Sequence, residues 1–267
     1  MRTASLANLM NPDDPFPSTH TTWMHDELAA GEERRRALRT VVMARYFEPL
    51  RVYVKGSSYR HLGESAELVS AFFVSRFARD DYLDAWKQSG MTLRRWLING
   101  LILSMREEIR RRRRAARRGM QDVRDGPPGS AAQASARNPS VADDAADEPN
   151  DPLAALESPE PEAQAAFERA WAISIFREAC EEVETICNAD GEGAMWIVFK
   201  RHFLDGLPYT LLVDETGYEP ARAAVVARTV ANRVRAALRR LIARDGIPAD
   251  EVEKELARIA ALMDGDE

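Results

Sequence analysis

The chain has 267 residues, of which 45% are hydrophobic and 30% charged, and its formal net charge is −6. This composition is that of a globular protein and excludes an integral membrane protein, while the length allows two modest domains. The apolar run at 96–105 is too short to span a bilayer, and the first seventeen residues, MRTASLANLMNPDDPFP, lack the apolar segment of a signal peptide. We therefore expect a cytoplasmic location and no membrane partner.

The net charge conceals two basic blocks and one acidic stretch. Eight arginines against two glutamates lie at 106–118, and seven arginines with no carboxylate lie at 222–244. Ten acids against two arginines lie at 122–162. Because basic blocks attract phosphate groups whatever the total charge, the acidic balance does not argue against a nucleic-acid partner.

Three helical segments are predicted in the first half, after a disordered start at 1–15. The segment 23–55 has an apolar face, and the segment 64–86 carries apolar core residues at helical spacing. The members of these two sets are Leu38, Val41, Val42, Tyr46 and Leu50, then Leu68, Val69, Phe72, Phe73 and Phe77. The third helix, 93–118, begins apolar and ends basic, so one end belongs to a core and the other meets anions.

The five consecutive arginines at 110–114 surround a helix, because they cannot all share one face. Favourable cations near a helix C-terminus explain one or two of the eight arginines in this block. An acidic membrane surface is the weaker alternative to nucleic acid, since no amphipathic anchor adjoins the block.

The second half is predicted to follow a linker. Residues 120–165 are rich in Pro, Gly, Ser, Ala and acids without a hydrophobic period, which predicts a disordered acidic linker. Helices resume at 166, continue at 195–204, and end with an amphipathic helix within 247–267. Cys180 and Cys187 fall on one face of one helix, which favours burial over a disulfide. With no strand pattern, we predict an all-α fold of two small helical domains, 16–119 and 166–246.

Residues 209–244 predict a helix-turn-helix. Leu211 begins an apolar helix, Gly217 can end it in a left-handed conformation, and Pro220 suits the first position of the next helix. Such a unit reads DNA with its second helix. A bundle helix with a solvated basic face explains the same pattern, and both interpretations stay open here. The second helix has a predicted apolar stripe at Val226, Val230, Val234, Leu238 and Leu241, with Arg228, Arg235 and Arg239 directed away from it.

Signatures of catalysis are missing from the sequence. The four histidines, His20, His25, His61 and His202, have no zinc-site spacing to one another or to the cysteines. No phosphate-binding loop, nucleotide-binding glycine fingerprint or nucleophile elbow occurs. We expect no enzyme activity, no catalytic residue, no metal and no cofactor.

Several motifs together resemble bacterial RNA polymerase sigma factors of the extracytoplasmic-function type, closest to the long variant of planctomycetes. The matching segments are FPSTHTTW at 16–23, LRRWL at 93–97 with the arginine run after it, SPEPEAQAAFERAWAIS at 158–174, the pair Tyr209 and Gly217, and DEVEKELARIAAL at 250–262. They cover nearly the whole chain in the family's order. The resemblance implies a region 2-like domain at 16–119, a region 4-like domain at 166–246 and a role in transcription initiation.

The resemblance also implies partners and site residues. Core RNA polymerase would bind through its β′ clamp helices and its β flap, promoter DNA would be read at the −10 and −35 elements, and an anti-sigma protein is a further candidate partner. The clamp-binding residues would be Glu67, Leu68, Phe72 and Phe73. The −10 and melting residues would be Trp96, Arg106, Arg110, Arg111, Arg112, Arg113 and Arg114. Arg222 and Arg228 would read −35 bases, with Arg233, Arg235 and Arg239 contacting phosphates or the polymerase.

An alternative function follows from the clamp-binding segment. Its sequence here is ELVSAFF, in which Glu67 is the only charged residue. A divergent sigma-like adaptor, which binds a partner protein or DNA without core polymerase, therefore remains open.

Overall fold

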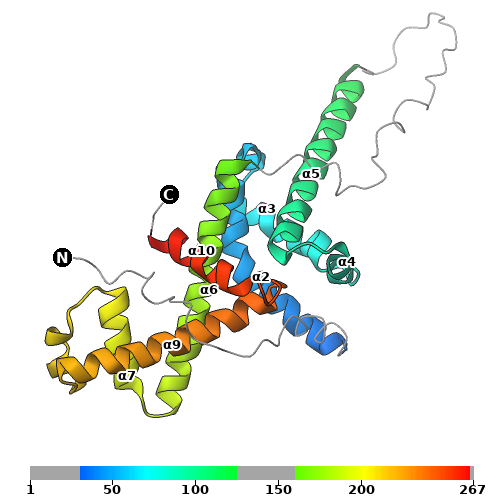
Figure 1. Ribbon diagram of the computed structural model, residues 1–267. Helices are drawn as coiled ribbons and strands as arrows, with labels where there is room; N and C mark the ends of the chain where they lie inside the picture. Colours follow the sequence, from blue (N-terminus) through cyan, green and yellow to red (C-terminus); the bar gives the residue numbers. More distant parts are fainter. Residues whose placement is uncertain (1–30, 125–159, 265–267) are drawn as a thin grey trace, which may run out of the picture.

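The computed structural model describes residues 31–124 and 160–264, and all regular structure in these two ranges is helical (Figure 1). The predicted all-α fold is confirmed. The predicted disordered start at 1–15, the motif at 16–23 and the linker residues 125–159 lie outside the described residues.

The first half opens with one long helix, α2 (Glu32–Gly56), followed by the short turn η2 (Ser58–Leu62). Its predicted apolar face is buried except for Val41, which is 40% exposed. The segment predicted at 64–86 forms three elements, which are α3 (Ser65–Phe72), the short π-helix η3 (Phe73–Phe77) and α4 (Tyr82–Ser89). They form an aromatic cluster in which the Tyr82 ring contacts both Phe72 and Phe77 edge to face.

The helix α5 (Leu93–Arg124) packs against α3 through its apolar start and then projects away from the body (Figure 1). A Cβ at Gly100 would lie 2.0 Å from the Tyr82 hydroxyl, so only glycine admits this ring against the helix. The helix continues beyond its predicted end at 118, into residues predicted as linker. Every described side chain from Arg110 to Arg117 is exposed.

The second half begins earlier than predicted, because α6 (Pro161–Ala189) starts at a proline. Proline fixes a helical φ and its missing N–H costs nothing in the first turn, so Pro161 begins a helix instead of extending the linker. Cys180 and Cys187 are buried and free, as predicted, and burial raises the pKa of the Cys180 thiol to about 12. The remaining elements are α7 (Gly193–Phe199), η4 (Lys200–Leu204), η5 (Tyr209–Leu211), α8 (Val213–Thr216), α9 (Pro220–Arg244) and α10 (Val252–Asp264).

The two halves share one hydrophobic core. α2 lies along α6, and α9 and α10 pack against α6 (Figure 1). Buried residues of both halves, from Leu38 in α2 to Leu262 in α10, form one continuous cluster. The division into two domains stays a prediction, but in this structure the halves form one body.

A buried carboxylate joins three helices at the centre of this body. Asp245, at the C-terminal end of α9, is 1% exposed. It accepts hydrogen bonds from Arg45 Nη1 at 2.5 Å, from the Tyr46 hydroxyl at 2.5 Å and from Trp171 Nε1 at 3.0 Å. Arg45 also donates two hydrogen bonds to Glu178 on α6, at 2.8 and 2.7 Å. Because the charges are buried but paired, the network ties α2, α6 and α9 together.

A second group of buried ion pairs, centred on Arg94, contacts the first through the Trp171 ring. Arg94, on α5, donates to Glu168 at 2.9 Å and to Glu255 at 2.7 Å. Its guanidinium carbon lies 3.9 Å from the centre of the Trp171 ring, which itself donates to Asp245. α5, α6 and α10 are thereby joined to the same centre, with an added cation–π contact.

We expect Asp245→Ala to lower the free energy of unfolding by about 3–5 kcal/mol, because it leaves Arg45 partly unpaired in a dry core. Asp245 is an acid at the C-terminus of α9, where the helix dipole disfavours negative charge. Removing this unfavourable interaction returns less than about 1 kcal/mol of the lost stability. Urea denaturation measures the difference. Asp80→Ala is the control, since Asp80 pairs with Arg39 at the surface and its loss costs at most about 1 kcal/mol. Equal losses in the two variants would contradict the account.

Candidate nucleic-acid interface

The helix-turn-helix prediction corresponds to η5, α8 and α9. Gly217 ends α8 with a φ of 71°, and Pro220 is the first residue of α9, as predicted. The first helix differs from the prediction: Leu211 is 66% exposed in a single turn, and only the next residue, Leu212, is buried. It is short because Pro208 precedes it and Gly217 ends it within a few residues.

The second helix is oriented by its buried side. The predicted stripe from Val226 to Leu241 is buried throughout, which confirms it. The first turns of α9 pack on Val198 and Leu212 in a separate small cluster with Ala223 and Val226. The opposite side of these turns consequently faces solvent.

Most arginines in the second part of α9 are neutralised within the chain. Arg233 forms an ion pair with Glu192, Arg240 one with Glu182, and Arg239 one with Glu253 at 2.6 Å. The prediction that Arg235 points outward is wrong: it is 7% exposed, with Nη1 3.5 Å from the Asn232 oxygen. The reason is that both α6 and α10 pack against α9, so the helix is covered on more than one side, which the helical period alone does not reveal. Arg233 and Arg239 are thus occupied by the chain's own carboxylates.

Arg222 and Arg228 differ from these residues. Both are exposed, and neither forms an ion pair with a carboxylate of the described chain. Arg228 lies near enough to Tyr209 to oppose the rise in the pKa of that phenol, which burial raises. The structure leaves these two predicted base readers available to an external anion.

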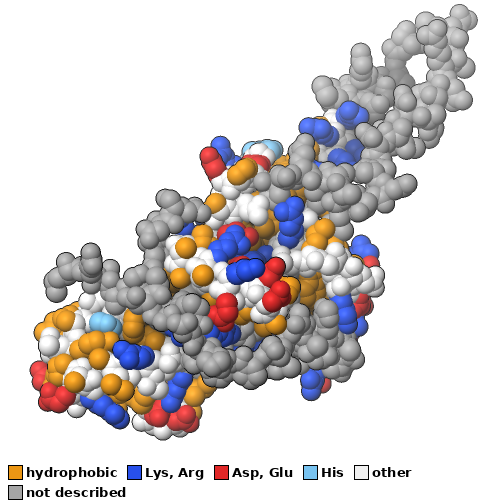
Figure 2. Space-filling model, viewed as in Figure 1, with side chains coloured by type: hydrophobic (Ala, Val, Ile, Leu, Met, Phe, Trp, Pro, Cys, Tyr) orange, Lys and Arg blue, Asp and Glu red, His pale blue; other side chains and the backbone are white. Residues whose placement is uncertain are grey.

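The basic end of α5 is the second exposed cationic surface (Figure 2). Arg111 and Arg112 pair with Glu108, and the hydrogen bond from Arg112 lowers the pKa of that carboxyl. Arg110, Arg113 and Arg114 are exposed and have no carboxylate partner among the residues described. Three of the five consecutive arginines therefore keep an uncompensated charge.

Two of the predicted melting residues, Trp96 and Arg106, do not belong to this exposed surface. Trp96 is 7% exposed, its ring centre lies 5.6 Å from that of Tyr82, and its Nε1 has no acceptor within the described chain. Arg106 is half-buried and donates to the Tyr59 hydroxyl at 3.3 Å. The role of Trp96 in melting stays a prediction, and in this conformation its ring is packed in the core with the apolar start of α5.

Two of the four predicted clamp-binding residues are buried, and the other two are at least partly exposed. Phe72 and Phe73 are 0% and 5% exposed, which confirms the core role predicted from the helical period and leaves neither ring open to a direct contact with a partner in this conformation. Glu67 is exposed and Leu68 is half-buried. Sequence reasoning missed Val74, which lies in the π-helical turn η3 and is 78% exposed. Its place outside the period of Phe73 and Phe77 is the signal that could have found it.

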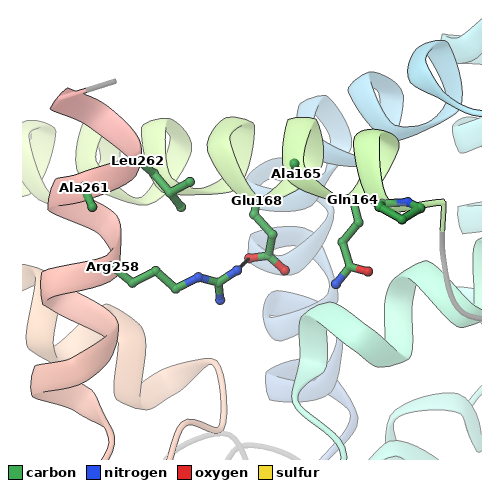
Figure 3. Close-up of a pocket in the computed structure, with 7 residues that line it drawn as sticks. Gln164, Ala165, Glu168, Arg258, Ala261 and Leu262 are labelled. Carbon is green, nitrogen blue, oxygen red and sulfur yellow. Dashed lines mark ion pairs between the residues drawn. The ribbon is translucent and has the colours of Figure 1, made fainter. Parts of the chain in front are cut away.

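A cavity of about 360 Å³ lies between α6 and α10 (Figure 3). Gln164 and Glu168 line it from one side and Arg258 and Leu262 from the other. Arg258 lies 3.5 Å from Glu168, which also pairs with Arg94. The charged groups of this cavity are thus already paired with each other.

Comparison of the chain with protein-family models, with curated proteins and with solved structures finds no match. Over residues 31–124 and 160–264, no group of three or more metal-ligating side chains is assembled. Nor does any helix in this part have the length and apolar character needed to cross a bilayer.

We expect the triple replacement of Arg110, Arg113 and Arg114 by alanine to reduce the salt dependence of binding to single-stranded DNA. Each lost phosphate contact lowers the slope of log affinity against log salt by about 0.7, so the total change is about 2. Titrations of a fluorescent oligonucleotide at several salt concentrations measure it.

The matched control replaces Arg36, Lys87 and Lys254, three exposed cations on other helices, and so removes the same charge. Its slope should equal that of the unchanged protein. Equal slopes for both triple variants would show that the end of α5 makes no phosphate contacts.

Proposed function

We propose that this chain is a promoter-recognition subunit of bacterial RNA polymerase, acting as a sigma factor of the extracytoplasmic-function type. The observation that carries the proposal is that some arginines of the two basic blocks form ion pairs with carboxylates of the chain, while others are exposed without such a partner. Within α9, pairing removes Arg233, Arg239 and Arg240, and leaves Arg222 and Arg228 for an outside anion. Within α5, the unpaired arginines lie beyond the core.

The two surfaces suit different nucleic-acid structures. The start of α9 follows a tight turn and has its inner side buried, as in helices that enter a major groove. The end of α5 is a projecting rod with cations on several faces, which suits the backbone of a separated strand. In this proposal, the first surface reads the −35 element and the second holds the melted −10 strand.

Core polymerase is the second partner in this proposal. Since Phe72 and Phe73 are buried, the surface of α3 and η3 available to it comprises Glu67, Ser70, Ala71 and Val74. Val74 is the most exposed large apolar side chain in the described part of the molecule. A single exposed apolar side chain is common on protein surfaces, so substitution of Val74 decides whether it contacts the polymerase.

A sigma-like adaptor without polymerase binding is the second candidate. Two observations favour it: the two halves share one core, and the polymerase-binding segment has its aromatic residues buried. The adaptor would use the same arginines on acidic partners or on DNA of any sequence.

A binding assay with purified core polymerase separates the two functions. We expect the full chain to bind core polymerase, and Val74→Asp to weaken binding about tenfold or more, because a charge would be buried in the contact. Val41→Asp is the control, since Val41 is exposed on α2, outside this surface. Absence of binding, while a known sigma factor binds the same polymerase, would refute the proposal and favour the adaptor.

A further inference from the structure

The exposed side of the first turns of α9 has an apolar centre between two arginines. Val225 is 54% exposed, although it lies one residue from the buried Val226. Arg222 precedes it by three residues and Arg228 follows it by three, so all three lie on the same side of the helix. Thr229, also exposed, is one turn beyond Val225. Because the opposite side is fixed in the small cluster, this arrangement does not depend on a mobile loop.

The exposed side of the first turns of α9 offers few kinds of functional group. It has two guanidinium groups, a valine and a threonine, and from 220 to 244 the helix has no carboxylate. Asn232 is exposed one turn further on, but its side-chain oxygen lies 3.5 Å from Arg235 Nη1 and is already engaged. The turns around Val225 themselves, from Arg222 to Thr229, have no amide, the usual reader of adenine, and no carboxylate for cytosine.

Base edges in the major groove have complementary chemistry. Guanine offers two acceptors that arginine can bind with two hydrogen bonds, and thymine alone among the four bases offers a methyl group. A single exposed valine needs no explanation on most surfaces. Here, however, it lies between Arg222 and Arg228, which no carboxylate of the described chain pairs, on the helix face that the proposed function places nearest the bases.

We propose that Val225 selects thymine by contacting its methyl group, with Arg222 and Arg228 binding guanines on either side of it. The inference rests on the proposed function, and it names the base composition that the start of α9 reads. Thr229 extends the apolar contact through its own methyl group.

The test uses deoxyuridine, which pairs as thymine does but lacks the methyl group. Duplexes bound by the full chain together with core polymerase are first selected from a random-sequence library. Each thymine of the selected element is then replaced singly by deoxyuridine. At the thymine that Val225 contacts, affinity should fall about fourfold, the effect of withdrawing one methyl group from an apolar contact.

Val225→Ala should bind the thymine and deoxyuridine duplexes with nearly equal affinity, since its shorter side chain no longer reaches the methyl group. Val41→Ala, the same change at an exposed valine of α2, should keep the fourfold difference. The inference is overturned if no thymine is sensitive to deoxyuridine, or if Val225→Ala retains the full sensitivity. Enrichment of no sequence at all would instead overturn the proposed promoter recognition, and the inference with it.

Discussion

The carboxylate of Asp245 is the constraint on which the arrangement of the helices depends. It ends α9 inside the core, against the direction that the helix dipole favours, and it is compensated by donors from α2 and α6. Burial alone would lower the pKa of Arg45, but Asp245 and Glu178 raise it above its ordinary value. Burial likewise raises the pKa of the Tyr46 phenol well above its usual range. The Arg45 guanidinium therefore stays charged and the Tyr46 phenol stays neutral over the physiological pH range.

This centre determines where the exposed charges lie. With its C-terminal end held against α2 and α6, α9 extends its other end away from the shared core, while α5 extends in another direction (Figure 1). Carboxylates of α6 and α10, and Glu192 just before α7, reach the middle and end of α9 and neutralise three of its arginines there. Of the two basic blocks, the parts that remain for an external anion are the start of α9 and the end of α5. The proposed function depends on this separation into an internally paired centre and two unpaired ends.

Much of the fold could be predicted from the sequence, because it is local. The helical period gave the all-α class, the buried stripe of α9 and the final helix, and Gly217 and Pro220 identified their turn from backbone preference alone. What could not be predicted joins distant residues. Arg45 and Asp245 are 200 positions apart, and nothing local distinguishes Arg45 from the arginines that precede it in α2. Arg235 was misjudged for the same reason, since a helix buried on more than one side hides positions that a single apolar stripe predicts as exposed.

At the candidate site, the burial of aromatic residues likewise depends on tertiary packing. The family resemblance suggested partner contacts for Phe72, Phe73 and Trp96, yet all three complete the core of the first half. Aromatic side chains bury large areas, and in a small helical unit they are needed inside. Val74 lies outside the period of Phe73 and Phe77, which could have indicated its exposure, whereas the exposure of Val225 depends on how the start of α9 packs.

Transcription in a purified system tests the central claim most directly. Core RNA polymerase from the source organism, mixed with the full chain and fragmented genomic DNA, is allowed to transcribe, and RNA 5′ ends are mapped. The account predicts starts at a defined set of positions that share an upstream element and require the chain. Starts that are the same with and without the chain would contradict it.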